Sequence, residues 1–171
     1  MRQLTRHYSG QAAECGVRYH KEESVRKLIS VIFLILLTGC ASPQKSDNAI
    51  FMEAATKYAS TLPPEQKSMS FPGIKIPSHG MIADSLAIAA GGGANATQLQ
   101  KELLAAKASG GKGFLIIGSS SSLDLAVIEN ATKSQDLSGM QIFYSGGPDK
   151  KNEIRAAVEK SKASFHFISA K

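Results

Sequence analysis

The stretch "GFLIIGSSSSLDLAVIENA", residues 113–131, joins a short apolar run to a segment with helical spacing. The run from Gly113 to Gly118 is rich in branched residues and lies between glycines, which is typical of a strand buried on both faces. Ser121 and Asp124 stand three residues apart after it, close to the spacing of a capping box. Three- and four-residue steps, which predict a helix, separate the apolar residues Leu123, Val127, Ile128 and Ala131.

The same alternation of strand and helix continues to the end of the chain. "MQIFYSG", residues 140–146, predicts a second strand, and "FHFIS", residues 165–169, a third. Between them, residues 149–162 have helical spacing, with Asp149 placed to cap the helix. The order β-α-β-α-β predicts a short parallel sheet with right-handed crossovers and helices that cover it. The fold class is therefore α/β.

Helical segments and a tether precede this unit. Glycine and proline bound an extended piece, residues 74–76, and a helix is expected over residues 81–90. The glycine triplet 91–93 after it is expected to be a flexible hinge, because no phosphate-binding pattern accompanies it. Residues 95–108 have the spacing of another helix. We assign residues 71–171 to one small α/β domain.

Residues 40–70 are expected to form a tether and one short helix. Ala41 to Ser46 is polar and contains a proline, as linkers do. From residue 47 to residue 59, apolar side chains recur at helical steps. Such a stripe packs either on its own domain or on a partner, and the spacing leaves both possibilities open.

An apolar run from Leu28 to Leu37 stands before the tether. It is too short to cross a bilayer, which takes about 20 apolar residues. Arg26 and Lys27 precede the run and small residues follow it, which is the arrangement of a secretory signal peptide. The alternative is a core helix, but the run has no polar stripe and gives way to a segment with proline and serine.

The run ends in Leu37-Thr38-Gly39-Cys40, which resembles the lipobox of bacterial lipoproteins. The resemblance implies that residues 25–39 are a signal peptide that is cut off, and that acyl chains on Cys40 anchor the protein in a membrane. The residue after Cys40 is Ala41. In the lipoproteins that this motif resembles, an aspartate at that position retains the protein in the inner membrane. The resemblance thus implies that the protein is anchored in the outer membrane, with its domain in the periplasm. The alternative is an ordinary thiol at Cys40 that pairs with Cys15.

Residues 1–24 do not resemble the short basic start of a signal peptide, because they contain three acidic residues and a cysteine. We expect them to be an extension of the gene model. Val25 would then be encoded by a GTG start codon and read as methionine.

The net charge of +6 is unevenly distributed. Half of the excess lies before the apolar run, and from Cys40 onward fourteen basic residues accompany eleven acidic ones. No long Lys/Arg run occurs in that part. The pattern predicts a mixed solvated surface and no nucleic-acid partner.

The loops after the first two predicted strands contain the candidate ligand or partner residues Ser119, Ser120, Ser121, Ser122, Ser145, Gly146 and Gly147. In a parallel sheet these loops border a crevice where ligands bind, and the helix amino termini that follow attract anions. A site for a small anionic or glycan ligand is therefore physically possible here, although the preference of serine and aspartate for N-cap positions favours a purely structural role. In that alternative these residues only form tight turns and cap helices.

Catalytic and metal-binding patterns are absent from the sequence after Cys40. Gly118 to Ser122 lacks the second glycine of a Gly-x-Ser-x-Gly elbow. His79 and His166 are far apart, and one cysteine with two distant histidines does not form a zinc site. We expect no enzyme, no metal and no cofactor, with a serine hydrolase as the weaker alternative.

The segments "GGKGFLIIGSSSSLDLAVIENA", "MQIFYSGGPDKKNEIRAAVEKS" and "FHFIS", within residues 110–169, are similar to the Cag-pathogenicity-island lipoprotein family of type IV secretion and plasmid conjugation systems. The resemblance implies a structural role in the outer-membrane part of a secretion channel, with protein partners in the envelope. A periplasmic lipoprotein that binds a small ligand or glycan is the second hypothesis.

Overall fold

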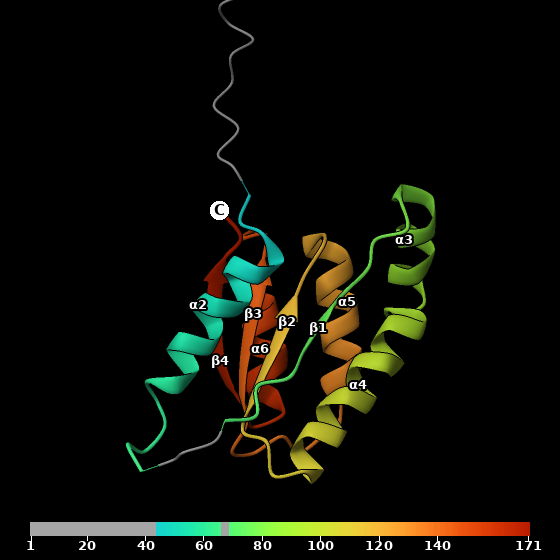
Figure 1. Ribbon diagram of the computed structural model, residues 1–171. Coiled ribbons are helices and arrows are strands. Elements are labelled where there is room, and N and C mark those ends of the chain that lie inside the picture. Colours follow the sequence, from blue (N-terminus) through green and yellow to red (C-terminus); the bar gives the residue numbers. More distant parts are fainter. Residues whose placement is uncertain (1–43, 66–68) are drawn as a thin grey trace, which may run out of the picture. The chain divides into compact units, whose positions relative to one another are not determined.

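Four parallel strands form the sheet of the computed structural model, which describes residues 44–65 and 69–171 (Figure 1). The strands are β1 (Gly73–Lys75), β2 (Gly113–Ile117), β3 (Gln141–Gly146) and β4 (Ser164–Ser169), and they lie side by side in chain order. The predicted α/β class and the parallel pairing of the last three strands are confirmed. The extended piece near residue 74 becomes a fourth parallel strand, paired with β2.

One face of the sheet is covered by helices that connect successive strands. They are α4 (Gly93–Ala108), α5 (Ser121–Thr132) and α6 (Lys151–Lys160), whereas α3 (Met81–Ala89), between β1 and α4, packs beside them on α5. Right-handed crossovers between strands in sequential order place their helices on the same side of a sheet. The larger apolar core lies here, between α4, α5 and α6 and sheet residues such as Phe114, Ile142 and Tyr144.

The opposite face is covered by α2 (Asp47–Ala59), which Figure 1 shows in front of the sheet. Its residues Ile50, Ala54 and Tyr58 pack in a second core with Leu115 and Phe143. The helix expected over residues 47–59 thus packs on its own domain, and the described residues belong to one compact unit. Because both faces are covered, alternate residues of β3 enter different cores, which explains its nearly continuous apolar run.

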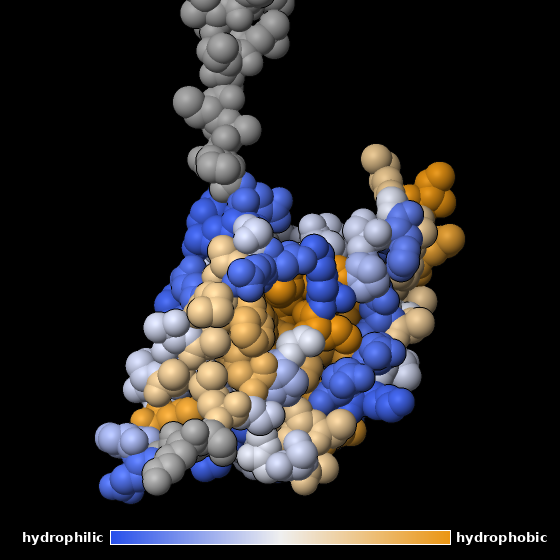
Figure 2. All heavy atoms as spheres, in the orientation of Figure 1, coloured by the Kyte–Doolittle hydropathy of each residue, from blue (hydrophilic) through white to orange (hydrophobic). Residues whose placement is uncertain are grey.

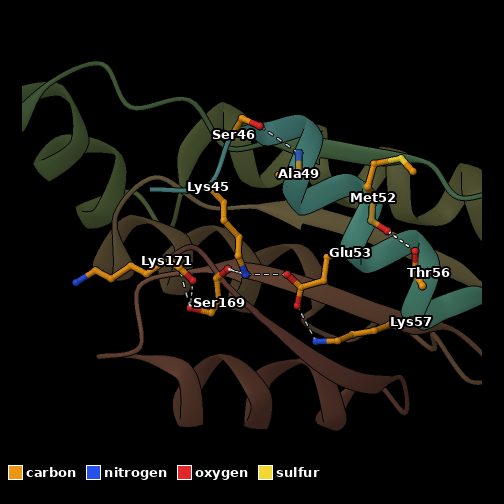
Figure 3. Close-up of polar contacts among 9 residues, drawn as sticks. All are labelled: Lys45, Ser46, Ala49, Met52, Glu53, Thr56, Lys57, Ser169 and Lys171. Carbon is orange, nitrogen blue, oxygen red and sulfur yellow. Dashed lines mark hydrogen bonds and ion pairs between the residues drawn. The ribbon is translucent and has the colours of Figure 1, made fainter. Parts of the chain in front are cut away.

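Polar contacts fix the start of α2 to the end of β4 (Figure 3). The Lys45 amide donates to the carbonyl oxygen of Ala170 at 2.9 Å. The Lys45 ammonium donates to the carbonyl oxygen of Ser169 at 3.1 Å and to the carboxylate of Glu53 at 2.7 Å. Ser46 caps the helix by accepting from the Ala49 amide at 3.2 Å. The chain therefore enters the domain at the carboxyl edge of the sheet.

The local predictions for the start of α6 and for the glycine triplet are wrong. No side chain caps α6, and its N-cap residue is Lys150 rather than Asp149. The glycine triplet is a packed turn instead of a flexible hinge: Gly92 is buried, and a Cβ atom there would lie 2.6 Å from the Val127 Cα atom. All three glycines have positive φ angles. Glycine is needed here because the turn passes closely over α5 with a left-handed backbone.

The lipobox with Cys40, the signal peptide 25–39 and the extension 1–24 lie outside the described residues. Within residues 44–65 and 69–171, the helices are all too short or too polar to cross a membrane.

Candidate functional site

A cleft of about 250 Å³ opens at the carboxyl edge of the sheet, on the face that α2 covers. Three residues that are register partners across neighbouring strands form one row along it: Lys75 of β1, Ile117 of β2 and Ser145 of β3. Register partners in a sheet point to the same face. Asp47 and Ile50, from the first turn of α2, line the cleft from the other side.

Four of the seven predicted loop residues line this cleft, namely Ser119, Ser145, Gly146 and Gly147. The other three, Ser120, Ser121 and Ser122, lie at the start of α5 and do not line it. Ser121 contacts the neighbouring loop, because a Cβ atom at Gly147 would lie 2.4 Å from its hydroxyl oxygen. The structure thus brings the two predicted loops together and turns part of the serine run away from the cleft.

Asp124 holds the β2–α5 loop in place from beneath. Its side chain is fully buried, and its Oδ1 atom accepts a 2.9 Å hydrogen bond from the Ser119 amide. Its Oδ2 atom accepts a 2.8 Å hydrogen bond from the Tyr144 hydroxyl. Burial raises the pKa of the Asp124 carboxyl above its ordinary value, against the opposing effect of these hydrogen bonds. Asp124 is therefore not the capping-box partner of Ser121, and it joins the loop to β3.

Ser145 is the buried polar residue of the cleft. It is 1% exposed, and its hydroxyl has no hydrogen-bond partner among the described residues. A buried hydroxyl without a partner is uncommon, because leaving one unpaired costs about 1–3 kcal/mol. The Ser145 hydroxyl is thus available to a ligand that reaches the wall of the cleft.

An ion pair crosses the mouth of the cleft. The Lys75 ammonium lies 2.7 Å from the Asp47 carboxylate, and both side chains are more than half exposed. The pair leaves the cleft with a balanced charge, a donor on one side and an acceptor on the other. Sequence reasoning missed both residues, because 28 positions separate them and neither belongs to a recognisable motif.

The cleft contains no histidine or cysteine among its described residues. His166 lies on β4 and stacks on Phe143, with ring centroids 4.6 Å apart. Burial lowers the pKa of the His166 imidazole. Within the described part of the chain, no three His, Cys, Asp or Glu side chains are grouped as metal ligands.

A second candidate site is an apolar surface on α3, which we call the α3 surface and define by Met81, Ile82 and Leu86. These side chains are 86%, 82% and 68% exposed. Figure 2 shows hydrophobic residues projecting from the outer side of this helix. No residue of α3 is fully buried. Exposed apolar side chains gathered on one element mark a contact site more often than scattered ones do.

Comparison with known proteins gives no relative: no protein-family model, curated protein sequence or solved structure matches this chain.

Proposed function

We propose that the protein is a lipoprotein of the outer membrane, anchored by Cys40, whose α/β domain docks onto a larger protein assembly of the envelope through the α3 surface. A type IV secretion or conjugation channel is the kind of assembly that the sequence resemblance implies. The observation that supports the docking role is the exposure of Met81, Ile82 and Leu86 on one short helix.

The α3 surface offers a substantial driving force for association. Burying a large aliphatic side chain contributes about 1.5–3 kcal/mol, so three of them supply several kcal/mol before the costs of association. The helix is held at its carboxyl end by the packed glycine turn, where Gly92 lies against Val127. At its amino end, Asp84 accepts hydrogen bonds from Ser78 and from the His79 amide. A fixed helix loses little conformational freedom on binding.

The charge of α3 favours a protein partner over a lipid surface. Helices that lie on anionic membranes carry lysine or arginine on their polar face. Residues 81–89 contain no basic residue and one acidic residue, Asp84. We therefore expect an apolar groove of another protein, rather than the bilayer, to cover the α3 surface.

The proposed anchor would hold the domain close to the membrane. Lys45, the residue fixed to the end of β4, follows Cys40 by five residues. Five residues span at most about 18 Å. The carboxyl edge of the sheet would then lie near the membrane. A partner would have to be a protein at the same membrane surface or one that extends to it.

The test compares two variants of the full chain, expressed at native level and purified from envelopes in mild detergent. In the first, Met81, Ile82 and Leu86 are replaced by serine, and we expect recovery of the partner to fall at least about tenfold. The matched control is Met52→Ser on α2, because Met52 is also exposed, at 57%, but lies outside the α3 surface. Unchanged recovery with the first variant would contradict docking through α3.

The anchor is tested separately with Cys40→Ser. We expect this variant to lose incorporation of labelled palmitate and to move from the membrane fraction to the soluble periplasmic fraction. If the variant remains in the membrane fraction after washes with high salt and carbonate, lipidation of Cys40 is not what anchors the protein.

A further inference from the structure

We infer that the cleft at the carboxyl edge of the sheet binds a neutral, polyhydroxylated ligand about the size of one sugar ring, held by Ser145, Lys75 and Asp47. This binding site goes beyond the proposed docking function and does not depend on it. The α3 surface and the cleft are built from different residues.

The first support is the hydroxyl of Ser145. It is buried in the wall of the cleft and lacks a partner among residues 44–65 and 69–171. Sites built to recognise a ligand hydroxyl place a buried polar group where only the ligand can pair with it. A serine hydroxyl both donates and accepts, and so does the hydroxyl of a sugar. The two groups are therefore complementary whichever one donates.

The second support is the balanced charge of Lys75 and Asp47. The two side chains neutralise each other at 2.7 Å across the mouth of the cleft. A ligand with a net charge would meet one favourable and one unfavourable group. A ligand with adjacent hydroxyls can accept from the ammonium and donate to the carboxylate at the same time, so it keeps both groups paired.

The third support is the size and the apolar lining of the cleft. A volume of about 250 Å³ lies just below the range of about 300–1,000 Å³ that is usual for ligand pockets, which suits a ligand of one ring. Ile117 in the row across the strands and Ile50 on α2 line opposite sides. The partly exposed Ile117 can pack against the C–H surface of a sugar ring while its hydroxyls reach the polar groups, and the buried Ile50 closes the opposite wall.

Saturation-transfer NMR and calorimetry on the full chain in detergent test the inference. The probes are D-glucose, D-galactose, N-acetylglucosamine and myo-inositol, with inorganic phosphate and glycine as charged and zwitterionic comparisons. We expect at least one polyol to bind, and Ser145→Ala to weaken it about tenfold, the effect of one lost hydrogen bond. Lys75→Gln, at an exposed position, should weaken it as well without affecting folding. Ser120→Ala outside the cleft is the matched control and should change nothing.

A second arm identifies the source of the ligand. Vesicles that carry a glycolipid ending in the bound sugar are compared with the free sugar, and preference for either source supports the site. Three outcomes would overturn the inference: no polyol binds in either arm; phosphate or glycine binds and the polyols do not; or Ser145→Ala and Lys75→Gln bind the polyol as tightly as the unchanged protein.

Discussion

The Tyr144 hydroxyl donates a hydrogen bond of 2.8 Å to the Asp124 carboxylate, although both residues are fully buried. The other oxygen of the same carboxylate accepts from the Ser119 amide. One buried side chain thus connects the loop after β2 to the interior of β3. Buried polar groups persist in folded proteins when they are paired in this way, because an unpaired one is costly. We expect this connection to set the position of the loop at the cleft.

The first prediction concerns pH. The raised pKa of Asp124 means that the folded protein disfavours the carboxylate. Its contribution to stability is therefore complete below the ordinary aspartate pKa and is lost as pH rises through the raised value. Asp124→Asn keeps an acceptor for the Ser119 amide and does not titrate. Urea unfolding from about pH 4 to pH 8 should show the variant gaining stability relative to the unchanged protein as pH rises. A difference that stays constant over this range would contradict burial as the dominant influence.

The second prediction concerns pairing. Asp124→Ala leaves the Ser119 amide and the Tyr144 hydroxyl without their acceptor, and each unpaired group costs about 1–3 kcal/mol of unfolding free energy. Adding Tyr144→Phe removes one of these groups. We expect the double variant to be more stable than Asp124→Ala alone, measured as the midpoint of urea unfolding. If the loss of unfolding free energy in the double variant equals the sum of the losses in Asp124→Ala and Tyr144→Phe, the two residues do not interact.

The third prediction concerns the space beneath the loop. A Cβ atom at Gly118 would lie 2.1 Å from Oδ2 of Asp124. Gly118→Ala should therefore force the carboxylate or the loop to move, at a cost of about 1–3 kcal/mol. Ser119→Ala changes the exposed neighbour and should remain within about 0.5 kcal/mol of the unchanged protein. Equal stability of the two variants would show that the loop can accommodate the methyl group.

The fourth prediction concerns His166. Burial lowers its pKa, so the folded protein favours the neutral imidazole. This contribution to stability is complete above the ordinary histidine pKa of about 6.5 and is lost as pH falls through the lowered value. His166→Phe preserves an aromatic ring against Phe143 and removes a buried nitrogen that has no partner among the described residues. Between about pH 7 and pH 5, the unchanged protein should lose more stability than the variant. If the unfolding free energies of the two proteins change equally with pH, burial does not lower the pKa of His166.

Much of the fold follows from local patterns in the sequence. The strands at residues 113, 141 and 164 are short apolar runs between turn residues, and the helix at residues 47–59 has clear spacing. Local patterns do not show which surface a helix covers. The packing of α2 on the second face of the sheet, and the pairing of the three-residue β1 with β2, depend on contacts between distant parts of the chain.

The cleft was only partly predictable for the same reason. Parallel strands bring the loops that contain Ser119 and Ser145 to one edge, so their proximity follows from the topology. Asp47 and Lys75 meet only because α2 packs on the face of the sheet, although 28 positions separate the two residues in the chain. The sequence also did not predict that Met81, Ile82 and Leu86 are exposed, because a mostly apolar helix is expected to be buried.

Site-specific photo-crosslinking in living cells tests docking through the α3 surface most directly. A photoreactive phenylalanine analogue replaces Ile82, which is 82% exposed, or Met52 on α2 as the matched control. We predict that irradiation crosslinks position 82 to one envelope protein, and that this product is much weaker at position 52 and disappears when Met81 and Leu86 are serine. Crosslinking of position 82 to lipid alone, or equal crosslinking of both positions to the same proteins, would contradict the account.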